Sequence, residues 1–337
     1  MKSIVLKEPR NLIIKEKSIP NIKNEEVLIK IKYGGVCGSD LHAYEGESPF
    51  VDFPITLGHE LVGYVENNND SEDLNNGDMV LIDPVLNCGD CYACKNDRHN
   101  VCKDVKVFGA HTDGGFQEYI AVPKGNVYKV PKGVDPRLAA LGEPLSIGFE
   151  STYRADVTED DTVLIIGTGT IGLMATIVAK YKGATVIAAD IDDSKLELAQ
   201  EMGADYIINS QKEDLETKVM ELTNGEGAPV VIEAAGLQKT IKEAIYYTSA
   251  AGRVVILGIV DKEVPISISQ LIKKEVDFLG SRLNNYMFGK VSKLLEEIDL
   301  SPLLKEIKIY KMDDASKAFE DKLQNPDISL KSLIEFS

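Results

Sequence analysis

The chain has 337 residues, which corresponds to about two domains at ~150 residues each. A hydrophobic content of 44%, with 27 Gly and 13 Pro, is typical of a globular protein and argues against a disordered chain or a fibre. The 54 acidic residues exceed the 37 basic residues, and the formal net charge of −17 argues against a general nucleic-acid or anionic-membrane binder.

The N-terminus carries no signal-peptide core, because Lys7, Glu8 and Arg10 interrupt its apolar residues. No segment approaches the ~18 consecutive apolar residues of a membrane span. We therefore expect a cytoplasmic protein without a membrane partner.

Two different sequence patterns follow one another along the chain. Residues 1–130 alternate short apolar runs with Gly, Pro and Asn turns, which predicts many short strands, and a helical pattern begins near Pro136. Beyond about residue 150, helix-like segments separate most of the β-branched-rich runs at 162–167, 185–190, 205–208, 230–236 and 253–258. This alternation predicts an α/β domain with a doubly wound parallel sheet. The tail after residue 284 is too short to be a domain alone, so we expect it to return to the first domain.

Four of the five cysteines crowd together in the order Cys88, Cys91, Cys94 and Cys102. In a reducing compartment this spacing indicates metal ligation before disulfides, and four thiolates can close a tetrahedral structural zinc site. An iron–sulfur cluster is the competing chemistry, although no Pro follows Cys102 as in bacterial ferredoxins. With four thiolates available, His99 is interpreted as a surface residue.

A glycine-rich turn joins the apolar run VLII to a helical pattern. It consists of Gly167, Thr168, Gly169, Thr170, Ile171 and Gly172. Glycines at these positions permit a tight turn, close approach of a pyrophosphate, and close packing of helix on strand. The N–H groups of the helix N-terminus would then face the phosphates.

Asp190 ends the next apolar run, where a carboxylate can accept hydrogen bonds from both hydroxyls of the adenosine ribose. The same charge would repel a 2′-phosphate, and residues 191–193 offer no arginine to receive one. NAD is therefore favoured over NADP. The alternative role of Asp190 is that of a helix N-cap.

A second metal site is predicted from separate segments that contain Cys37, His59 and Glu60. A thiolate, an imidazole and a carboxylate form a plausible zinc set that leaves a position open for a substrate oxygen. Singly, these residues could be a core thiol, a turn histidine and a surface charge. Their occurrence beside a nicotinamide fingerprint favours the joint functional interpretation.

The order of these motifs resembles the zinc-dependent medium-chain dehydrogenases over essentially the whole chain. The motifs are Cys37-Gly38-Ser39-Asp40-Leu41-His42, Gly58-His59-Glu60, the four cysteines, Glu143-Pro144-Leu145 and the turn at 167–172. Within that superfamily, the EPL motif and Ser281-Arg282-Leu283-Asn284 are similar to the sorbitol dehydrogenase branch. The resemblance is greatest to bacterial sugar-acid oxidoreductases of the L-galactonate or L-idonate type, some of which are labelled starvation-sensing.

The resemblance implies a GroES-like β-rich catalytic domain at 1–148 and 285–337, with a structural zinc lobe at 86–104. It also implies a Rossmann NAD-binding domain at 149–284. Each chain would bind two Zn²⁺ ions, one catalytic and one structural, and relatives are commonly dimers or tetramers.

The resemblance also assigns roles around the catalytic zinc. Cys37 and His59 match the constant ligands, and Glu60 matches a residue that ligates zinc or lies behind it. Glu143 matches the glutamate that ligates zinc or holds its water in polyol dehydrogenases. Ser39 and His42 match the proton relay, and Asp40 fits a role in fixing the tautomer of His59.

These roles predict reversible oxidation of a secondary alcohol on a sugar acid or polyol. Arg282 could pair with Glu143 or bind a substrate carboxylate bidentately, and Asn284 could hydrogen-bond a hydroxyl. We keep three alternatives open: L-threonine as substrate, a diol as substrate, and a catalytically silent, NAD-bound regulator. Arg282 could also be an ordinary surface arginine.

Overall fold

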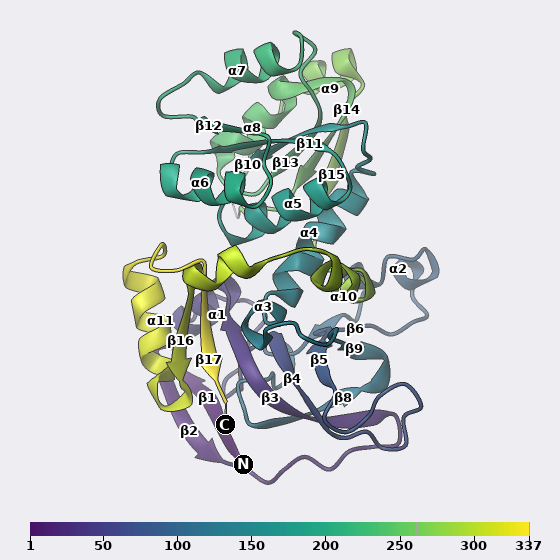
Figure 1. Ribbon diagram of the computed structural model, residues 1–337, viewed down its shortest axis with the longest axis vertical. Helices are drawn as coiled ribbons and strands as arrows, with labels where there is room; N and C mark the ends of the chain where they lie inside the picture. The colour runs from purple at the N-terminus through teal and green to yellow at the C-terminus, as the bar shows by residue number, and fades with distance from the viewer. Residues whose placement is uncertain (261, 337) are drawn as a thin grey trace. The chain divides into compact units, whose positions relative to one another are not determined.

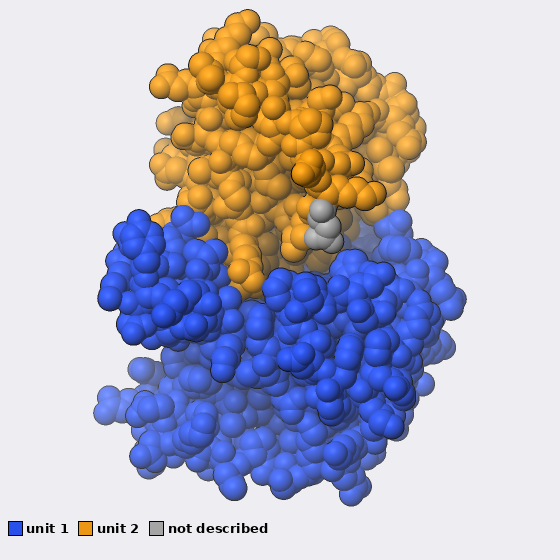
Figure 2. Space-filling view, turned by 180° about the vertical axis from the view of Figure 1, so that it is seen from behind, with its two compact units in different colours: residues 1–143, 285–337 blue, residues 144–284 orange. Residues whose placement is uncertain are grey.

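The computed structural model describes residues 1–260 and 262–336. The chain forms two compact units, residues 1–143 with 285–337 and residues 144–284, which Figure 2 shows in two colours. The division after Glu143 falls inside helix α4 (Gly142–Arg154), whereas the sequence placed the boundary at residue 148. None of the helices in the described ranges combines the length and apolarity needed to cross a membrane.

The first unit is built on a seven-stranded sheet in the order β16-β17-β3-β4-β5-β9, with β8 paired to β3. Its strands are β3 (Glu26–Val36), β4 (Glu60–Asn67), β5 (Met79–Ile82), β8 (Tyr119–Pro123), β9 (Val127–Lys129), β16 (Ile307–Lys311) and β17 (Lys331–Glu335). Strand β3 alternates buried and half-buried residues, with Val27, Ile29 and Ile31 turned into the core. This period of two is the pattern of a strand with one covered face.

The C-terminal segment completes this sheet, because β17 pairs antiparallel with β3 in a register that places Ser332 opposite Val36 (Figure 1). Phe336 is fully buried and stacks on Phe116, while Phe319 meets Phe116 edge-on. The tail therefore contributes both a central strand and core aromatic rings to the first unit.

Smaller elements surround this sheet. They are β1 (Lys2–Glu8), β2 (Asn11–Glu16), β6 (Val85–Leu86), β7 (Lys106–Val107), α1 (Gly38–Glu45), α2 (Tyr92–Lys95), α3 (Pro136–Ala139), α10 (Phe288–Glu297) and α11 (Ala315–Gln324). The hairpins β1–β2 and β6–β7 are each antiparallel.

The second unit is a six-stranded parallel sheet in the order β12-β11-β10-β13-β14-β15 (Figure 1). Its strands are β10 (Thr162–Ile166), β11 (Thr185–Asp190), β12 (Tyr206–Asn209), β13 (Ala228–Glu233), β14 (Thr248–Ile256) and β15 (Asp277–Gly280). The helices of the unit are the larger part of α4, α5 (Thr170–Tyr181), α6 (Asp193–Glu201), α7 (Leu215–Leu222), α8 (Gln238–Tyr247) and α9 (Ile268–Lys274). In chain order this is the 3-2-1-4-5-6 arrangement of the Rossmann fold, so the predicted doubly wound sheet is confirmed.

Strand β13 ends at Glu233, although the apolar run continues to Gly236. The side chain of Glu233 accepts hydrogen bonds from the N–H groups of Ala235 and Gly236, at 3.1 and 2.9 Å. These donors are withdrawn from the sheet ladder, and the backbone turns at this point.

Candidate active site and metal centres

Cys37 lies where the central strand of the first unit meets a helix. It is the N-cap residue of α1, directly after the end of β3. Its backbone N–H donates to Asp40 Oδ2 at 2.9 Å, so a carboxylate in the first turn fixes the strand-to-helix junction. The sulfur of Cys37 is thereby placed beside the start of the neighbouring strand β4, where His59 and Glu60 lie.

Asp40 also orients His59. The carboxylate of Asp40 is 2% exposed, and its Oδ1 lies 3.6 Å from Nδ1 of His59. Burial disfavours the charged imidazole, but the charges of Asp40 and Cys37 outweigh burial and raise the pKa of His59 well above its usual value. With Nδ1 turned to Asp40, Nε2 is the nitrogen left to face a metal.

Glu60 is buried and held by a lysine from the C-terminal strand. Its Oε1 accepts a 2.6 Å hydrogen bond from Nζ of Lys331, and both side chains are at most 5% exposed. Its Oε2 has no hydrogen-bond partner among the residues that the structure describes. Gly35 lies opposite Glu60 in the sheet, and a Cβ there would come within 2.1 Å of Oε2. Lys331 and Gly35 therefore define the position of this carboxylate.

The ligand atoms of Cys37, His59 and Glu60 all lie within 4.8 Å of one another. Thiolate, imidazole and carboxylate are donors that zinc accepts, and three protein ligands leave an open position. The buried Oε2 of Glu60 without a partner is the atom such an ion would satisfy. These residues therefore fit a catalytic zinc.

Glu143 is 7% exposed and begins the first turn of α4. Burial raises the pKa of Glu143 to about 7; the charge of His59 acts against this rise, while that of Glu60 adds to it. Glu143 therefore belongs to the same electrostatic site, although it lies outside the three-residue group within 4.8 Å. A carboxyl with a pKa near neutrality is suited to exchange a proton at this site.

The two residues of the expected proton relay lie on the exposed side of α1. The hydroxyl of Ser39 is 3.5 Å from Nε2 of His59, and Nδ1 of His42 is 3.1 Å from Oε2 of Glu47. No hydrogen bond joins Ser39 to His42 among the described residues, so a relay would need water or substrate between them.

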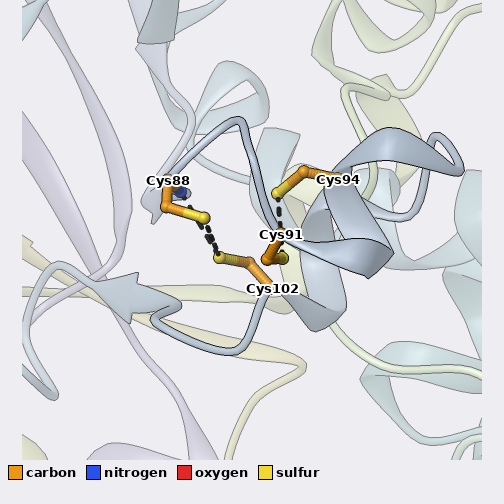
Figure 3. Close-up of side chains that lie close together, drawn as sticks. All are labelled: Cys88, Cys91, Cys94 and Cys102. Carbon is orange, nitrogen blue, oxygen red and sulfur yellow. Dashed lines mark hydrogen bonds between the residues drawn. The ribbon is translucent and has the colours of Figure 1, made fainter.

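The four cysteines of the loop at 88–102 turn their sulfurs toward one another (Figure 3). The Sγ atoms of Cys91 and Cys94 are 3.5 Å apart, and those of Cys88 and Cys102 are 3.4 Å apart. Four thiolates around one tetrahedral zinc are about 3.8 Å from each other, given Zn–S bonds of about 2.3 Å. This spacing fits a single ion and disfavours the iron–sulfur alternative, because a cluster holds its thiolates farther apart.

The glycine turn of the second unit has the geometry that a dinucleotide site requires. Gly167 has φ +89°, and a Cβ there would lie 2.7 Å from N of Ala235. A Cβ at Gly172 would lie 1.8 Å from the carbonyl oxygen of Gly167, whereas nothing lies within 4 Å of one at Gly169. The first and third glycines therefore serve packing, and the middle glycine leaves open space at the N-cap of α5.

Asp190 is not a helix N-cap. Its Oδ2 accepts from N of Thr168 at 2.7 Å and from Oγ1 of Thr168 at 3.1 Å. Asp192 caps α6 instead, by accepting from N of Ser194 at 2.8 Å. The structure therefore ties Asp190 to the glycine turn and excludes the N-cap alternative.

The two predicted substrate residues differ in exposure. Arg282 is exposed, whereas Asn284 is 1% exposed. His99 also differs from its expected place on the surface. It is half-buried, and its ring lies against that of Tyr286 in a tilted arrangement, with the centroids 4.6 Å apart.

The sequence analysis missed Lys331, which lies at this candidate site. No local motif marks it, because a lysine in the run DISLKSLIEF could face solvent equally well. Only the pairing of β17 with β3 brings it to Glu60.

Comparisons with known proteins define the family. Residues 23–132 match the alcohol dehydrogenase GroES-like domain, and residues 170–299 match the zinc-binding dehydrogenase model. The chain therefore belongs to the zinc-type medium-chain dehydrogenases, which are oxidoreductases.

Individual relatives span the whole chain or most of it. L-galactonate-5-dehydrogenase of Escherichia coli K12 is 33% identical, covering 100% of this chain and 99% of that protein. L-threonine 3-dehydrogenase of Pyrococcus horikoshii is 35% identical over 90% of each chain. The structure of RspB from Escherichia coli CFT073, complexed with NADH, is 35% identical and superposes with a TM-score of 0.91, covering 100% and 99% of the two chains.

Proposed function

We propose that this chain is a zinc-dependent, NAD-linked dehydrogenase that oxidises a secondary hydroxyl of a sugar acid or polyol. The observation that carries the proposal is the convergence of Cys37, His59 and Glu60, with the unpartnered Oε2 of Glu60 buried among them. The relatives named above include a sugar-acid dehydrogenase and a protein with bound NADH.

Zinc held by Cys37, His59 and Glu60 would supply Lewis acidity that lowers the pKa of a substrate hydroxyl. Asp40 keeps the imidazole of His59 in one orientation, and Lys331 keeps the carboxylate of Glu60 in place. Ser39 and the exposed His42 lie on the side from which a proton can leave to solvent. Glu143, with a pKa raised to about 7, is a second group able to accept it.

The second unit binds the cofactor in this proposal. The open space at Gly169 accommodates the pyrophosphate, and the carboxylate of Asp190 accepts hydrogen bonds from the ribose. The same negative charge disfavours a 2′-phosphate, which is the reason for proposing NAD.

The decisive experiment measures NADH formation with a panel of aldonates, polyols, diols and L-threonine. We expect aldonates or polyols to give the highest kcat/KM. Cys37→Ser should abolish turnover while leaving NADH binding intact. Cys88→Ser is measured beside it as the comparison variant, because it changes a cysteine of the other group. Retained turnover in Cys37→Ser would refute the zinc mechanism. If the wild-type protein formed no NADH with any compound of the panel, the result would favour a catalytically silent, NAD-bound regulator.

We further propose that Arg282 binds the substrate carboxylate. Arg282→Ala should then weaken oxidation of L-galactonate more than that of sorbitol, because only the former carries a carboxylate for a bidentate contact. Equal losses would reject this role. L-threonine remains the second candidate substrate, because one of the relatives is named L-threonine 3-dehydrogenase.

A further inference from the structure

The four-cysteine loop is joined to the segment where the chain returns to the first unit. The side chain of Asn285 makes two hydrogen bonds to the loop backbone. Its Oδ1 accepts from N of His99 at 3.0 Å, and its Nδ2 donates to the carbonyl oxygen of Asp97 at 2.6 Å. Both partners lie between Cys94 and Cys102, so Asn285 bridges the part of the loop that carries two of the thiolates.

Tyr286 makes a second connection on the other side of the cysteines. Its hydroxyl accepts a 2.8 Å hydrogen bond from Nδ2 of Asn87, the residue that precedes Cys88. Its ring contacts the imidazole of His99 in a tilted arrangement, with the centroids 4.6 Å apart. Two consecutive residues therefore hold both ends of the cysteine loop.

The returning segment, residues 283–286, contains backbone conformations that its residue types do not favour. Leu283 and Tyr286 have φ of +52° and +58°, in the left-handed region that is unfavourable for a residue with a Cβ. Such conformations persist where surrounding contacts determine them. Asn285 lies between these two residues, and both Asn285 and Tyr286 hydrogen-bond to the loop, so the loop contacts the segment at the site of this conformation.

We propose that the four-cysteine loop is a clamp on Asn285 and Tyr286, so that metal binding in the loop and ordering of residues 283–286 are coupled. Asn87, Asp97 and His99 belong to the cysteine loop or adjoin it, and the four cysteine sulfurs lie within 4.8 Å of one another. A zinc ion bound there would displace the thiol protons, hold the four thiolates together and so stabilise the folded loop. Coupling between two binding events is reciprocal. The returning segment must therefore raise the affinity of the loop for zinc as much as zinc orders the segment.

This clamp does not depend on the alcohol that is oxidised. Arg282 and Asn284 lie on the same short segment.

Competition for zinc with a chelator tests one direction of the coupling. The full chain with Cys37→Ser is used as parent, so that the loop retains its zinc while the catalytic site loses its own. Asn285→Ala, which removes two hydrogen bonds, should weaken zinc retention about tenfold, and Tyr286→Phe a few-fold. Tyr92→Phe is the matched control, because Tyr92 is in the loop but 85% exposed. Retention within twofold of the parent in both Asn285→Ala and Tyr286→Phe would overturn the proposal.

Amide hydrogen exchange of the zinc-loaded wild type tests the other direction. Removing the loop zinc with a chelator should raise exchange in residues 283–287, while the amide of Phe116, bonded to Leu57 in the first core, stays protected. Exchange that rises in the loop and not in residues 283–287 would refute the clamp. If the parent Cys37→Ser kept two zinc ions per chain, the proposed function would fail while the clamp could still be measured.

Discussion

Lys331 donates a 2.6 Å hydrogen bond to Glu60 across 271 positions of sequence, and both side chains are buried. A buried carboxylate is tolerated only when a partner compensates its lost hydration. The pair therefore explains why a buried glutamate can occupy the start of β4 in the first unit.

Replacing this lysine should damage both stability and metal binding. Lys331→Met leaves Glu60 as an uncompensated buried charge, and we expect a loss of about 3–5 kcal/mol in the free energy of unfolding. Denaturant unfolding and zinc content per chain measure the two effects. Lys32→Met breaks the half-exposed pair with Glu335 in the same unit and should cost less than about 1 kcal/mol. Equal effects of the two substitutions would contradict the conclusion that Lys331 compensates the buried charge of Glu60.

Gly35→Ala should displace the carboxylate of Glu60 from its other side. The new methyl group would meet Oε2 at 2.1 Å, so the side chain or the strand must move, at about 1–3 kcal/mol. We expect loss of zinc from the catalytic site with the cysteine loop still loaded. Gly38→Ala, where no atom lies within 4 Å of the new methyl, is the control and should retain both metals. If the Gly35→Ala protein kept both zinc ions, the carboxylate of Glu60 would be able to accommodate the new methyl group, and the expected displacement would be wrong.

Asp190→Asn should weaken NADH binding by about tenfold or more, because it removes charge-assisted hydrogen bonds to the ribose and to Thr168. Fluorescence titration with NADH measures the Kd. Asp192→Asn is the matched control two positions away. Because Asp192 only caps α6, this change should reduce stability by at most about 1 kcal/mol and leave the Kd unchanged. Equal changes in Kd would place the cofactor elsewhere.

Glu233 predicts a pH dependence of stability in the second unit. Burial raises the pKa of Glu233 above its usual 4.5, against the hydrogen bond from Thr240. The folded protein then binds more protons than the unfolded chain above about pH 4.5, so this group lowers stability as pH rises through its folded pKa.

Glu233→Gln removes the titration while keeping an oxygen to accept from Ala235 and Gly236. Its stability relative to wild type should therefore improve as pH is raised from about 4.5 toward neutrality, as measured by urea unfolding at several pH values. Glu226→Gln, which alters an exposed carboxylate of the same unit, should keep the wild-type slope. A wild-type slope in Glu233→Gln would show that the carboxyl is ionised throughout.

Much of the site was predictable because its signals are local. The spacing of Cys88, Cys91, Cys94 and Cys102 within one loop, and of the three glycines within one turn, restricts the backbone over a few residues. The strands of the second unit were also predictable, since burial on both faces favours continuous apolar runs rich in β-branched residues, such as Val163–Ile165. Such features carry their physical cause within a short window of sequence.

Other features depended on contacts between distant segments. A sequence pattern could not distinguish Asp190 from Asp192 as the cap of α6, because both precede the helix and both residue types cap well. Nor could it show that the rings of His99 and Tyr286, 187 positions apart in sequence, contact each other. Tertiary packing decided between alternatives that were locally equivalent.

The sequence by itself determined which ligand types this protein has and roughly where along the chain each group lies, because thiolate spacing and glycine turns are properties of short segments. Only the tertiary structure decided that the carboxylate of Glu60 is neutralised by Lys331 and accommodated by Gly35. The physical reason is that a buried charge requires a partner within hydrogen-bond distance, and strand pairing, not sequence proximity, sets which residue is within that distance.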